Sequence, residues 1–447
     1  MARRKGADRS LKGGQRVELD VVTIAPSGDG IAEREDGTDV HVPGALPGEQ
    51  VAARVGHRSR QIARAYASLE EVIAPSTSRR VAPCEHQGRC DGCPLMIADE
   101  PAQRRFKRAM LRETYRLDVD RMVHDAGAEL GYRRSSKRVA GGTPGAVLLG
   151  SYRRRTHVVA GMRQCLVDGP TIAACARELE ATARELEIAP YDEKSRHGLL
   201  RYALFKADGD GEVLTCLVLA ASEPTAAAEL AAGVPSAAGV SWCTQASVGN
   251  VLRGDQVEHL KGKQSLTVEL AGVSAEVGPL GFLQPNPAVA SLAYRDLVCT
   301  RAGEPLAGGH ALDLFAGTGA TTALLREQFE RVTPSETFPE SCAVLGIEPI
   351  SATELLATLL DGSLEHRDVD AVVADPPRSG LGAELCAQLC ELAPRRLHLM
   401  SCSGASLHRD LDHLLKPAGC FRLVGLRGYD TLPQTPHVEL VAWLERR

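Results

Sequence analysis

One cysteine of this sequence stands at the end of a predicted strand, where its thiol could take part in a reaction. In the stretch LMSCSGASLHRDL, a strand ends at Cys402 and a helix begins directly after it. A thiol at a helix N-terminus lies at the positive end of the helix dipole, which favours the thiolate form. A lone cysteine is more often a small core side chain. Its position nevertheless makes Cys402 a candidate nucleophile.

Two further predicted strands bring acidic side chains to similar positions. In VDAVVADPPRSGL, an apolar strand ends at Asp375, and Arg378 offers a guanidinium fork to a carbonyl or phosphate oxygen. Enzymes that methylate amines often carry Asn-Pro-Pro-Tyr at the comparable strand end, so the form found here favours a ring-carbon target. In TLPQTPHVELVAWL, Glu439 lies in the last predicted strand, which strengthens the interpretation of Cys402 as a nucleophile.

A glycine turn indicates a nucleoside-binding site. In ALDLFAGTGATT, a buried strand ends at Asp313–Phe315, and Gly317 and Gly319 open a turn into a helix. Glu336 follows about twenty residues later and can accept the two ribose hydroxyls of a nucleoside. A dinucleotide fingerprint would have a third glycine where Thr322 stands. The shorter loop looks like that of an S-adenosylmethionine methyltransferase.

Cysteines are concentrated in CEHQGRCDGC, which contains Cys84, Cys90 and Cys93. The basic start MARRKGADRSLKGG has no apolar stretch after it, so we expect no secretory signal and a cytoplasmic location. In a reducing cytoplasm disulfides are disfavoured and metal binding becomes the stronger interpretation. Thiolates of this kind bind either zinc or an iron–sulfur cluster, and the residue types leave both open.

The elements that must position these residues indicate an α/β fold. From about residue 287 a predicted helix, 287–300, leads into alternating strands and helices, which predict a doubly wound parallel sheet over residues 281–447. Residues 76–280 read as a mixed α/β central domain that holds the cysteines. A basic helix is expected over residues 102–117. No apolar run is long enough to span a membrane.

The N-terminal part has a different texture. Residues 15–75 contain short strand-like runs separated by Pro-Gly and Gly turns, which predict a small barrel of the oligonucleotide-binding type. The run APSGDGIAEREDGTDVHVPGALPGEQVAARV resembles a TRAM domain, a small RNA-binding barrel. Residues 1–14 read as a disordered basic tail.

Charge is unevenly distributed along the chain. Residues 1–165 carry 29 Lys and Arg against 20 Asp and Glu, whereas the remainder carries 23 against 37. A basic N-terminal part joined to an acidic remainder indicates a polyanion-binding portion beside a catalytic one, although charge can also fluctuate along a chain without such a role.

The motifs together resemble one enzyme family. FLQPN, DLFAGTG, DPPRSGL, SCSGASLHRDL and QTPHVELV occur in the order seen in the RNA uracil-5-methyltransferases. The resemblance covers nearly the whole chain. It is greatest to the bacterial ribosomal-RNA branch, which carries both a TRAM domain and an iron–sulfur cluster.

The resemblance implies methyl transfer from S-adenosylmethionine to carbon 5 of a uridine, with 23S ribosomal RNA as the partner and a monomeric enzyme. Cys402 is implied as the nucleophile and Glu439 as the base, with Arg378 near the target base. The implied donor-binding residues are Gln284, Phe315, Glu336 and Asp375. The target uridine has to leave its stack to reach Cys402.

The resemblance also supplies a fourth cysteine ligand. Cys165, in RQCLV, follows Cys93 after a gap of 71 residues, and the four cysteines are implied as ligands of a [4Fe–4S] cluster. Zinc would accept the same four sulfurs. Since methyl transfer by this route moves no net electrons, we expect the cluster to be structural.

The chain departs from the family pattern in two places. Ala320 stands where family members often carry a polar residue, commonly Asn, and residues 337–368 are difficult to align, which leaves the adenine-side contact unassigned. The alternatives are a transfer-RNA uracil-5-methyltransferase and a catalytically weak RNA-binding or assembly factor that kept the fold.

Overall fold

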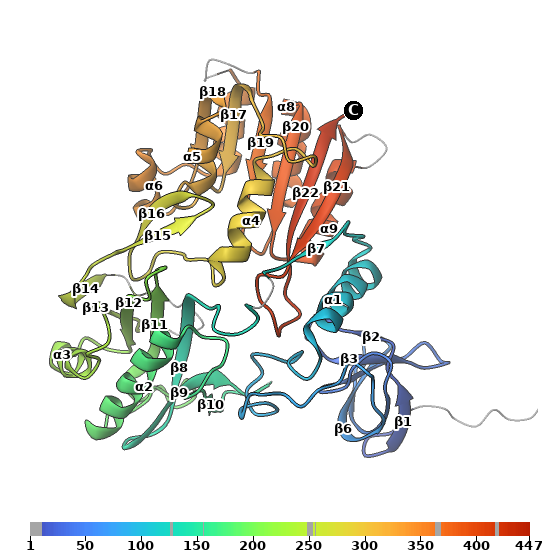
Figure 1. The fold of residues 1–447 in the computed structure, drawn as a ribbon, viewed down its shortest axis with the longest axis vertical. Coiled ribbons are helices and arrows are strands. Elements are labelled where there is room, and N and C mark those ends of the chain that lie inside the picture. The colour runs from blue at the N-terminus through green and yellow to red at the C-terminus, as the bar shows by residue number, and fades with distance from the viewer. Residues whose placement is uncertain are drawn as a thin grey trace, which may run out of the picture. The chain divides into compact units, whose positions relative to one another are not determined.

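The computed structural model describes residues 11–125, 128–154, 156–247, 254, 256–362, 368–415 and 420–447 (Figure 1). The chain divides into two compact units. Unit 1 consists of Met1–Gly88, Gly92–Asp118 and Pro433–His437, and unit 2 of Arg89–Asp91, Val119–Leu432 and Val438–Arg447. Most of the predicted basic tail, residues 1–14, lies outside the described residues.

Unit 1 contains a six-stranded sheet in the order β1-β5-β6-β4-β3-β2. Buried and exposed residues alternate along β1, so Val17 and Leu19 face the core while their neighbours face solvent. All its neighbouring strands are antiparallel except β4 and β6, which are parallel. The strands are β1 (Arg16–Asp20), β2 (Thr23–Ile24), β3 (Gly30–Glu33), β4 (Asp39–Val42), β5 (Gln50–Arg58) and β6 (Arg64–Ala74).

The basic helix of unit 1, α1 (Glu100–Tyr115), begins and ends two residues earlier than predicted. Asp99 caps it, because its carboxylate accepts a 2.7 Å hydrogen bond from the Ala102 N–H. Arg116, at φ 55°, leaves the helical conformation and ends it. The helix packs with the segment Pro433–His437, since Gln434 donates its backbone N–H to the Gln103 side chain at 2.9 Å.

Unit 2 begins with a seven-stranded sheet in the order β10-β9-β8-β11-β12-β13-β14. Its main core forms against helices α2 (Pro170–Glu185) and α3 (Pro224–Ala232). The strands are β8 (Ser135–Thr143), β9 (Ala146–Tyr152), β10 (Val159–Gly161), β11 (Leu200–Ala207), β12 (Val213–Leu219), β13 (Gly239–Thr244) and β14 (Val257–Gly262). A hairpin of β15 (Leu266–Leu270) and β16 (Val273–Val277) follows.

The C-terminal sheet of unit 2 has the order β18-β17-β19-β20-β22-β21-β7. From β18 to β20 the neighbours are parallel, and β22 runs antiparallel to both β20 and β21. The strands are β17 (Gly308–Leu314), β18 (Phe329–Ser335), β19 (Ala371–Ala374), β20 (Arg396–Ser401), β21 (Phe421–Tyr429), β22 (Glu439–Arg446) and β7 (Met122–Val123).

Helices cover both faces of this sheet (Figure 1). Helices α4 (Pro287–Leu297) and α5 (Ala320–Arg326) share a core with alternate residues of the strands. On the other face α8 (Gly382–Leu392) packs between α7 (Ala352–Leu360) and α9 (Gly404–Leu415). Helix α6 (Pro339–Leu345) follows β18. The predicted fold class, with its doubly wound C-terminal domain, is confirmed. In the described part of the chain, no helix is both long and apolar enough to cross a membrane.

Candidate active site

Three of the predicted donor-binding residues come to one edge of the C-terminal sheet. Leu314 pairs with Ser335 on one side and with Ala374 on the other. Phe315, Glu336 and Asp375 each follow one of these paired residues directly. Because the strands are parallel, all three lie at the carboxyl ends where ligands of doubly wound sheets bind.

The turn between β17 and α5 is built from left-handed residues. Gly317 has φ 55° and Gly319 has φ 86°, and a side chain on Gly319 would come within 2.8 Å of the Leu345 methyl carbon. Phe315, which is not a glycine, also has a positive φ of 61°. Such a conformation is uncommon for an aromatic residue and marks a functional site when the surroundings hold it.

Glu336 ties this turn to the end of β18. Its Oε2 accepts a 2.9 Å hydrogen bond from the Gly317 N–H, and its Oε1 accepts from the N–H groups of Thr337 at 2.7 Å and Phe338 at 2.8 Å. A carboxylate has about four acceptor positions, so roughly one is left for a ligand hydroxyl. The carboxylate predicted to bind a ribose is thus also a structural part of the turn.

Asp313 is buried beneath the glycine turn. Its Oδ2 accepts hydrogen bonds from the hydroxyls of Thr321 at 2.7 Å and Thr322 at 2.5 Å, which fixes the first turn of α5 to β17. Burial raises the pKa of Asp313 to about 6, against the opposing effect of the two hydroxyls. Thr322 therefore occupies the place of the missing third glycine with a structural hydrogen bond.

A hydrogen-bonded chain connects Gln284 with Asp375 through Tyr294. The Gln284 Nε2 donates to the Tyr294 hydroxyl at 3.2 Å, and that hydroxyl donates to the Asp375 Oδ2 at 2.8 Å. Burial raises the pKa of Asp375 to about 6, and the Tyr294 bond lowers it in part. Sequence reasoning missed Tyr294, since a tyrosine within a predicted helix gives no signal of its own.

Cys402 and Glu439 come to the same sheet edge on adjacent antiparallel strands. The β20–β22 ladder ends with the pair Ser401–Leu440, and Cys402 and Glu439 are the next residue on each strand. Ser403 then starts α9, because its hydroxyl accepts from the Ser406 N–H at 3.3 Å. Both residues are partly exposed. The arrangement places a thiol and a carboxyl group where a ligand can reach both.

The electrostatics of the thiol differ from the sequence prediction. Burial raises the pKa of Cys402, the charges of Glu439 and Asp375 add to this, and Arg378 opposes it. The helix dipole was expected to favour the thiolate, but in this structure the acidic surroundings and burial favour the thiol. Burial likewise raises the pKa of Glu439 to about 8, with Asp375 adding and Arg378 opposing.

The loop that carries Arg378 is held by Asp410 of α9. The Asp410 carboxylate accepts from the N–H groups of Leu381 at 2.8 Å and Gly382 at 3.2 Å. A side chain on Gly380, at φ 77°, would come within 2.3 Å of the same carboxylate. Arg378 is exposed and acts on Cys402 and Glu439 through its charge. Asp410 was not predicted, although it lies in SCSGASLHRDL.

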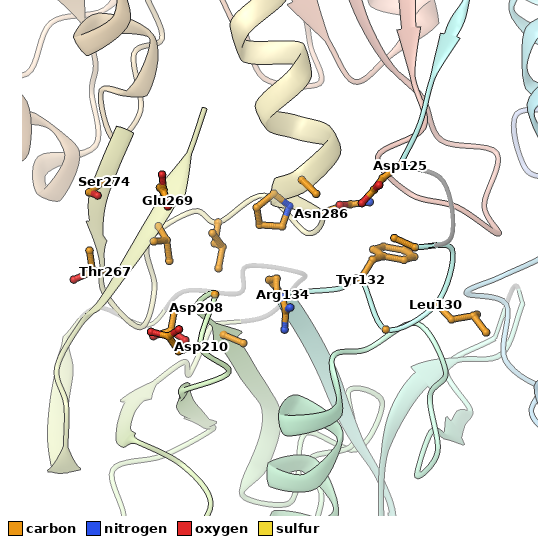
Figure 2. Close-up of a pocket in the computed structure, with 18 residues that line it drawn as sticks. Asp125, Leu130, Tyr132, Arg134, Asp208, Asp210, Thr267, Glu269, Ser274 and Asn286 are labelled. Atoms are coloured by element: carbon orange, nitrogen blue, oxygen red, sulfur yellow. The ribbon is translucent and has the colours of Figure 1, made fainter. Parts of the chain in front are cut away.

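A cavity of about 560 Å³ lies near the start of α4 (Figure 2). Its lining includes Arg134, Asp208 and Glu269, together with Asn286, which caps α4 and is two residues from Gln284. None of the predicted catalytic or donor-binding residues lines it. The cavity therefore borders the segment FLQPN without containing the candidate site.

Comparison with known proteins assigns the family. No protein-family model matches the chain. A protein named as an uncharacterized RNA methyltransferase of Geobacter sulfurreducens is 31% identical over 99% of this chain and 92% of its own length. A second of that name, from Gloeobacter violaceus, is 30% identical and covers 98% of each chain.

The chain belongs to the RNA methyltransferase family. The fold of this RNA methyltransferase is also that of a solved structure, the Pyrococcus abyssi tRNA (uracil-54, C5)-methyltransferase in complex with S-adenosyl-L-homocysteine. The two chains superpose with a TM-score of 0.75 over 95% of this chain and 99% of that one, at 22% sequence identity.

The four predicted metal ligands of the RNA methyltransferase belong to different units. Cys84 and Cys93 lie in unit 1, and Cys90 and Cys165 lie in unit 2. All four are partly exposed, and none of the thirteen cysteines forms a disulfide. Among the described residues, no three Cys, His, Asp or Glu side chains lie close enough together to hold a metal ion.

The two departures from the family pattern are both in the predicted donor-binding part of the chain. Ala320 is the buried first residue of α5, and no side chain caps this helix. The segment that is difficult to align, 337–368, forms α6 and α7, and its residues 363–367 lie outside the described residues. The adenine-side contact stays unassigned.

Proposed function

We propose that this RNA methyltransferase transfers a methyl group from S-adenosylmethionine to carbon 5 of a uridine in 23S ribosomal RNA. The observation that carries the proposal is the position of Cys402 and Glu439, one residue beyond the Ser401–Leu440 pair, at the sheet edge that also holds Asp375. A nucleophile beside a base is what carbon methylation of a pyrimidine requires.

The donor-binding role rests on Gln284, Phe315, Glu336 and Asp375. Three of these residues follow paired strand ends, and the fourth is connected to Asp375 through Tyr294. Burial raises the pKa values of the Asp313, Asp375 and Glu439 carboxyl groups, and a cation bound beside them would lower these values and favour the carboxylate forms. S-adenosylmethionine is such a cation and supplies an electrophilic methyl group on its sulfonium sulfur.

Cys402 acts first in the proposed reaction. Its sulfur adds to carbon 6 of the uracil, which breaks the double bond between carbons 5 and 6 and gives carbon 5 the character of an enolate carbanion. Because the free thiol is favoured before substrate binds, its proton must pass to solvent, which reaches the partly exposed Cys402, as the bond forms. Arg378, whose charge lowers the pKa of Cys402, favours that step.

Glu439 acts after carbon 5 has taken the methyl group. Carbon 5 then carries both the methyl group and its original proton, and the Glu439 carboxylate removes the proton. The electron pair returns to the ring as the bond to Cys402 breaks, which restores the double bond and releases the enzyme. A pKa of about 8 suits a base that must accept a proton near neutral pH.

The proposed domains divide the chain into an RNA-binding barrel, a central domain and a methyltransferase domain. Residues 15–75 are proposed as a TRAM-like barrel that binds RNA, with residues 1–14 as a basic tail. Residues 76–280 form the central domain and residues 281–447 the methyltransferase domain. The target uridine is flipped out of its stack to reach Cys402. The enzyme is proposed to act as a monomer in the cytoplasm.

The four cysteines are proposed as ligands of a structural [4Fe–4S] cluster. Support comes from the donor set, since Cys84, Cys90, Cys93 and Cys165 are outside disulfides and partly exposed. The described side chains do not fit a metal ion as they are placed, so no step of the reaction is assigned to the cluster.

Transfer RNA is the alternative substrate, because the solved structure of the same fold is a transfer-RNA uracil methyltransferase. The deciding experiment incubates the purified enzyme and methyl-labelled donor with 23S ribosomal RNA or with transfer RNA, followed by nuclease digestion and mass spectrometry. We expect 5-methyluridine in the ribosomal RNA. Label in transfer RNA alone would assign the other substrate, and label in neither would favour a binding or assembly factor.

A further inference from the structure

One end of the β5–β6 hairpin in unit 1 is strongly basic. Residues 57–66, HRSRQIARAY, contain three arginines and no acidic residue. Arg58 and Arg60 are exposed, and Ile62 between the strands is 53% exposed. A cluster of exposed cations attracts anionic partners.

Arginines elsewhere in the same sheet are neutralised by ion pairs. Arg16 lies 3.3 Å from the Glu70 carboxylate and 3.2 Å from that of Glu71, and Arg54 lies 2.5 Å from the Glu70 carboxylate. These pairs lie further along the β5–β6 ladder from the hairpin end. The basic charge of this part of the sheet is thus paired with carboxylates, although both arginines are about half exposed.

Arg58 and Arg60 have no such partner among the described carboxylates of unit 1, since none lies within 4.0 Å of either guanidinium. The charge of Arg58 acts on the carboxylate of Asp36, which itself lies 3.8 Å from the Arg34 guanidinium. Hydrogen bonds from Thr38 lower the pKa of Asp36, and the charges of Arg34 and Arg58 add to this. Arg58 and Arg60 are therefore available to external anions.

A row of rings crosses three strands beside these arginines. His41 of β4 pairs with Tyr66 of β6, which pairs with His57 of β5. The His41 and Tyr66 rings are 5.3 Å apart and tilted, and the His57 and Tyr66 rings are 6.3 Å apart and nearly parallel, at 14°. His41 is buried and His57 is exposed. The row thus ends in an exposed ring face.

We propose that His57, Arg58, Arg60 and Tyr66, the hairpin patch, bind a single-stranded segment of the RNA substrate. Arg58 and Arg60 contact phosphates, and an unstacked base lies on the His57 ring that Tyr66 supports. Single-stranded nucleic acid is bound by this combination of a cationic track and ring faces, whereas a duplex hides its base faces. The assignment rests on the proposed function only in taking RNA as the partner.

The test compares two double variants of the full-length protein that lose equal charge. R58Q/R60Q alters the hairpin patch, and R16Q/R54Q removes ion-paired arginines of the same sheet. Binding of a fluorescent single-stranded RNA of twenty nucleotides is measured by anisotropy over a range of KCl concentrations, without methyl donor. Circular dichroism melting checks that both variants are folded.

We expect R58Q/R60Q to reduce the slope of log affinity against log salt by about 1.4, since each phosphate contact with a single strand contributes about 0.7. The slope of R16Q/R54Q should stay within about 0.3 of the wild type. Equal slopes for the two double variants would overturn the phosphate assignment.

The ring face is tested separately with H57A. We expect about five-fold weaker binding of the single strand with an unchanged salt slope, because a stacking contact rather than a charge is lost. Affinity for a blunt RNA duplex of the same length should not change. Equal weakening for both probes would contradict base stacking. Since no methyl transfer is measured, failure of the proposed reaction would leave these results interpretable, whereas wild-type protein that binds no RNA would overturn both proposals.

Discussion

Cys402 and Glu439 lie one residue beyond the Ser401–Leu440 pair, at the same end of neighbouring antiparallel strands. The antiparallel direction of β22 matters, because it brings the beginning of that strand to the edge where β17, β19 and β20 end. The proposed nucleophile and the proposed base therefore come from opposite ends of their strands, although 36 residues separate them in the sequence.

The pH dependence of the reaction should follow Glu439. In the proposed reaction its carboxylate form is the base, and burial holds its pKa at about 8, so kcat/KM should rise as pH increases from 6 to above 8. R378Q removes a charge that lowers the pKa values of Glu439 and Cys402. The midpoint of the rising limb should therefore move up by about 0.5 pH or more.

A surface arginine provides the control for that profile. R422Q removes a cation that pairs with Glu445 at 2.7 Å on an exposed part of the β21–β22 ladder. Its profile should match that of the wild type. A profile that moves to lower pH in R378Q, or equally in both variants, would contradict the electrostatic role of Arg378.

Tyr294 should position the donor-binding carboxylate. Y294F keeps the ring but removes the hydroxyl that donates to Asp375 and accepts from Gln284. Because that bond lowers the pKa of Asp375, its loss makes the carboxylate less available at neutral pH. We expect KM for S-adenosylmethionine to rise about ten-fold, the equivalent of about 1.4 kcal/mol, with a smaller change in kcat.

Tyr429 offers a matched control for a general loss of stability. Its hydroxyl also donates to an aspartate, Asp296, but away from the candidate site. Y429F should lower the melting temperature and leave KM for the donor unchanged. If both variants raised KM equally, Tyr294 would be a structural residue only.

Asp375 should reduce stability at alkaline pH in the absence of ligand. Its folded-state pKa of about 6 exceeds its usual value of 3.8, so its contribution lowers the free energy of unfolding as pH rises from about 4 to 6, and the loss persists above that pH. D375N removes this effect and should raise the free energy of unfolding by about 1–2 kcal/mol at pH 8. The gain should vanish near pH 4. Chemical denaturation of both proteins at pH 4 and pH 8 measures this difference. Equal gains at the two pH values, or no gain at either, would contradict the assignment.

The fold, and the position of the candidate site residues at strand ends, could be predicted because both follow local patterns. Where an apolar run is followed by glycines, by Asp375 or by Cys402, the sequence predicts the end of a strand. Parallel strands bring such ends together at one edge of the sheet. The predicted helix 287–300 is observed as α4, which ends three residues earlier, at Leu297. The proposed domain boundaries follow the same patterns and stay a prediction.

What the sequence could not predict depends on three-dimensional surroundings. The pKa of Cys402 was expected to be low from its helix N-terminus, but burial and two carboxylates from distant segments raise it. Tyr294 lies 81 residues before its partner Asp375, and Asp410 holds a loop 29 residues away. Such contacts arise from packing between elements, which local periodicity does not specify.

The metal proposal predicts iron. Protein purified without oxygen should contain about four irons per chain, and both C90S and C165S should lose them. C299S serves as the control, because Cys299 lies outside the proposed ligand set and is also partly exposed. Stoichiometric zinc without broad visible absorption would contradict a cluster, and iron retained in C165S would exclude that cysteine as a ligand.

The central claim is that Cys402 attacks and Glu439 later removes the proton, and covalent trapping tests it most directly. Each variant is incubated with RNA and methyl-labelled donor and analysed on a denaturing gel. E439Q should accumulate a protein–RNA adduct that carries the label, because it stalls after methyl transfer, whereas C402A should form none while still binding RNA. A labelled adduct in C402A, with Cys420 or another thiol as nucleophile, or no adduct in a folded, RNA-binding E439Q, would contradict the account.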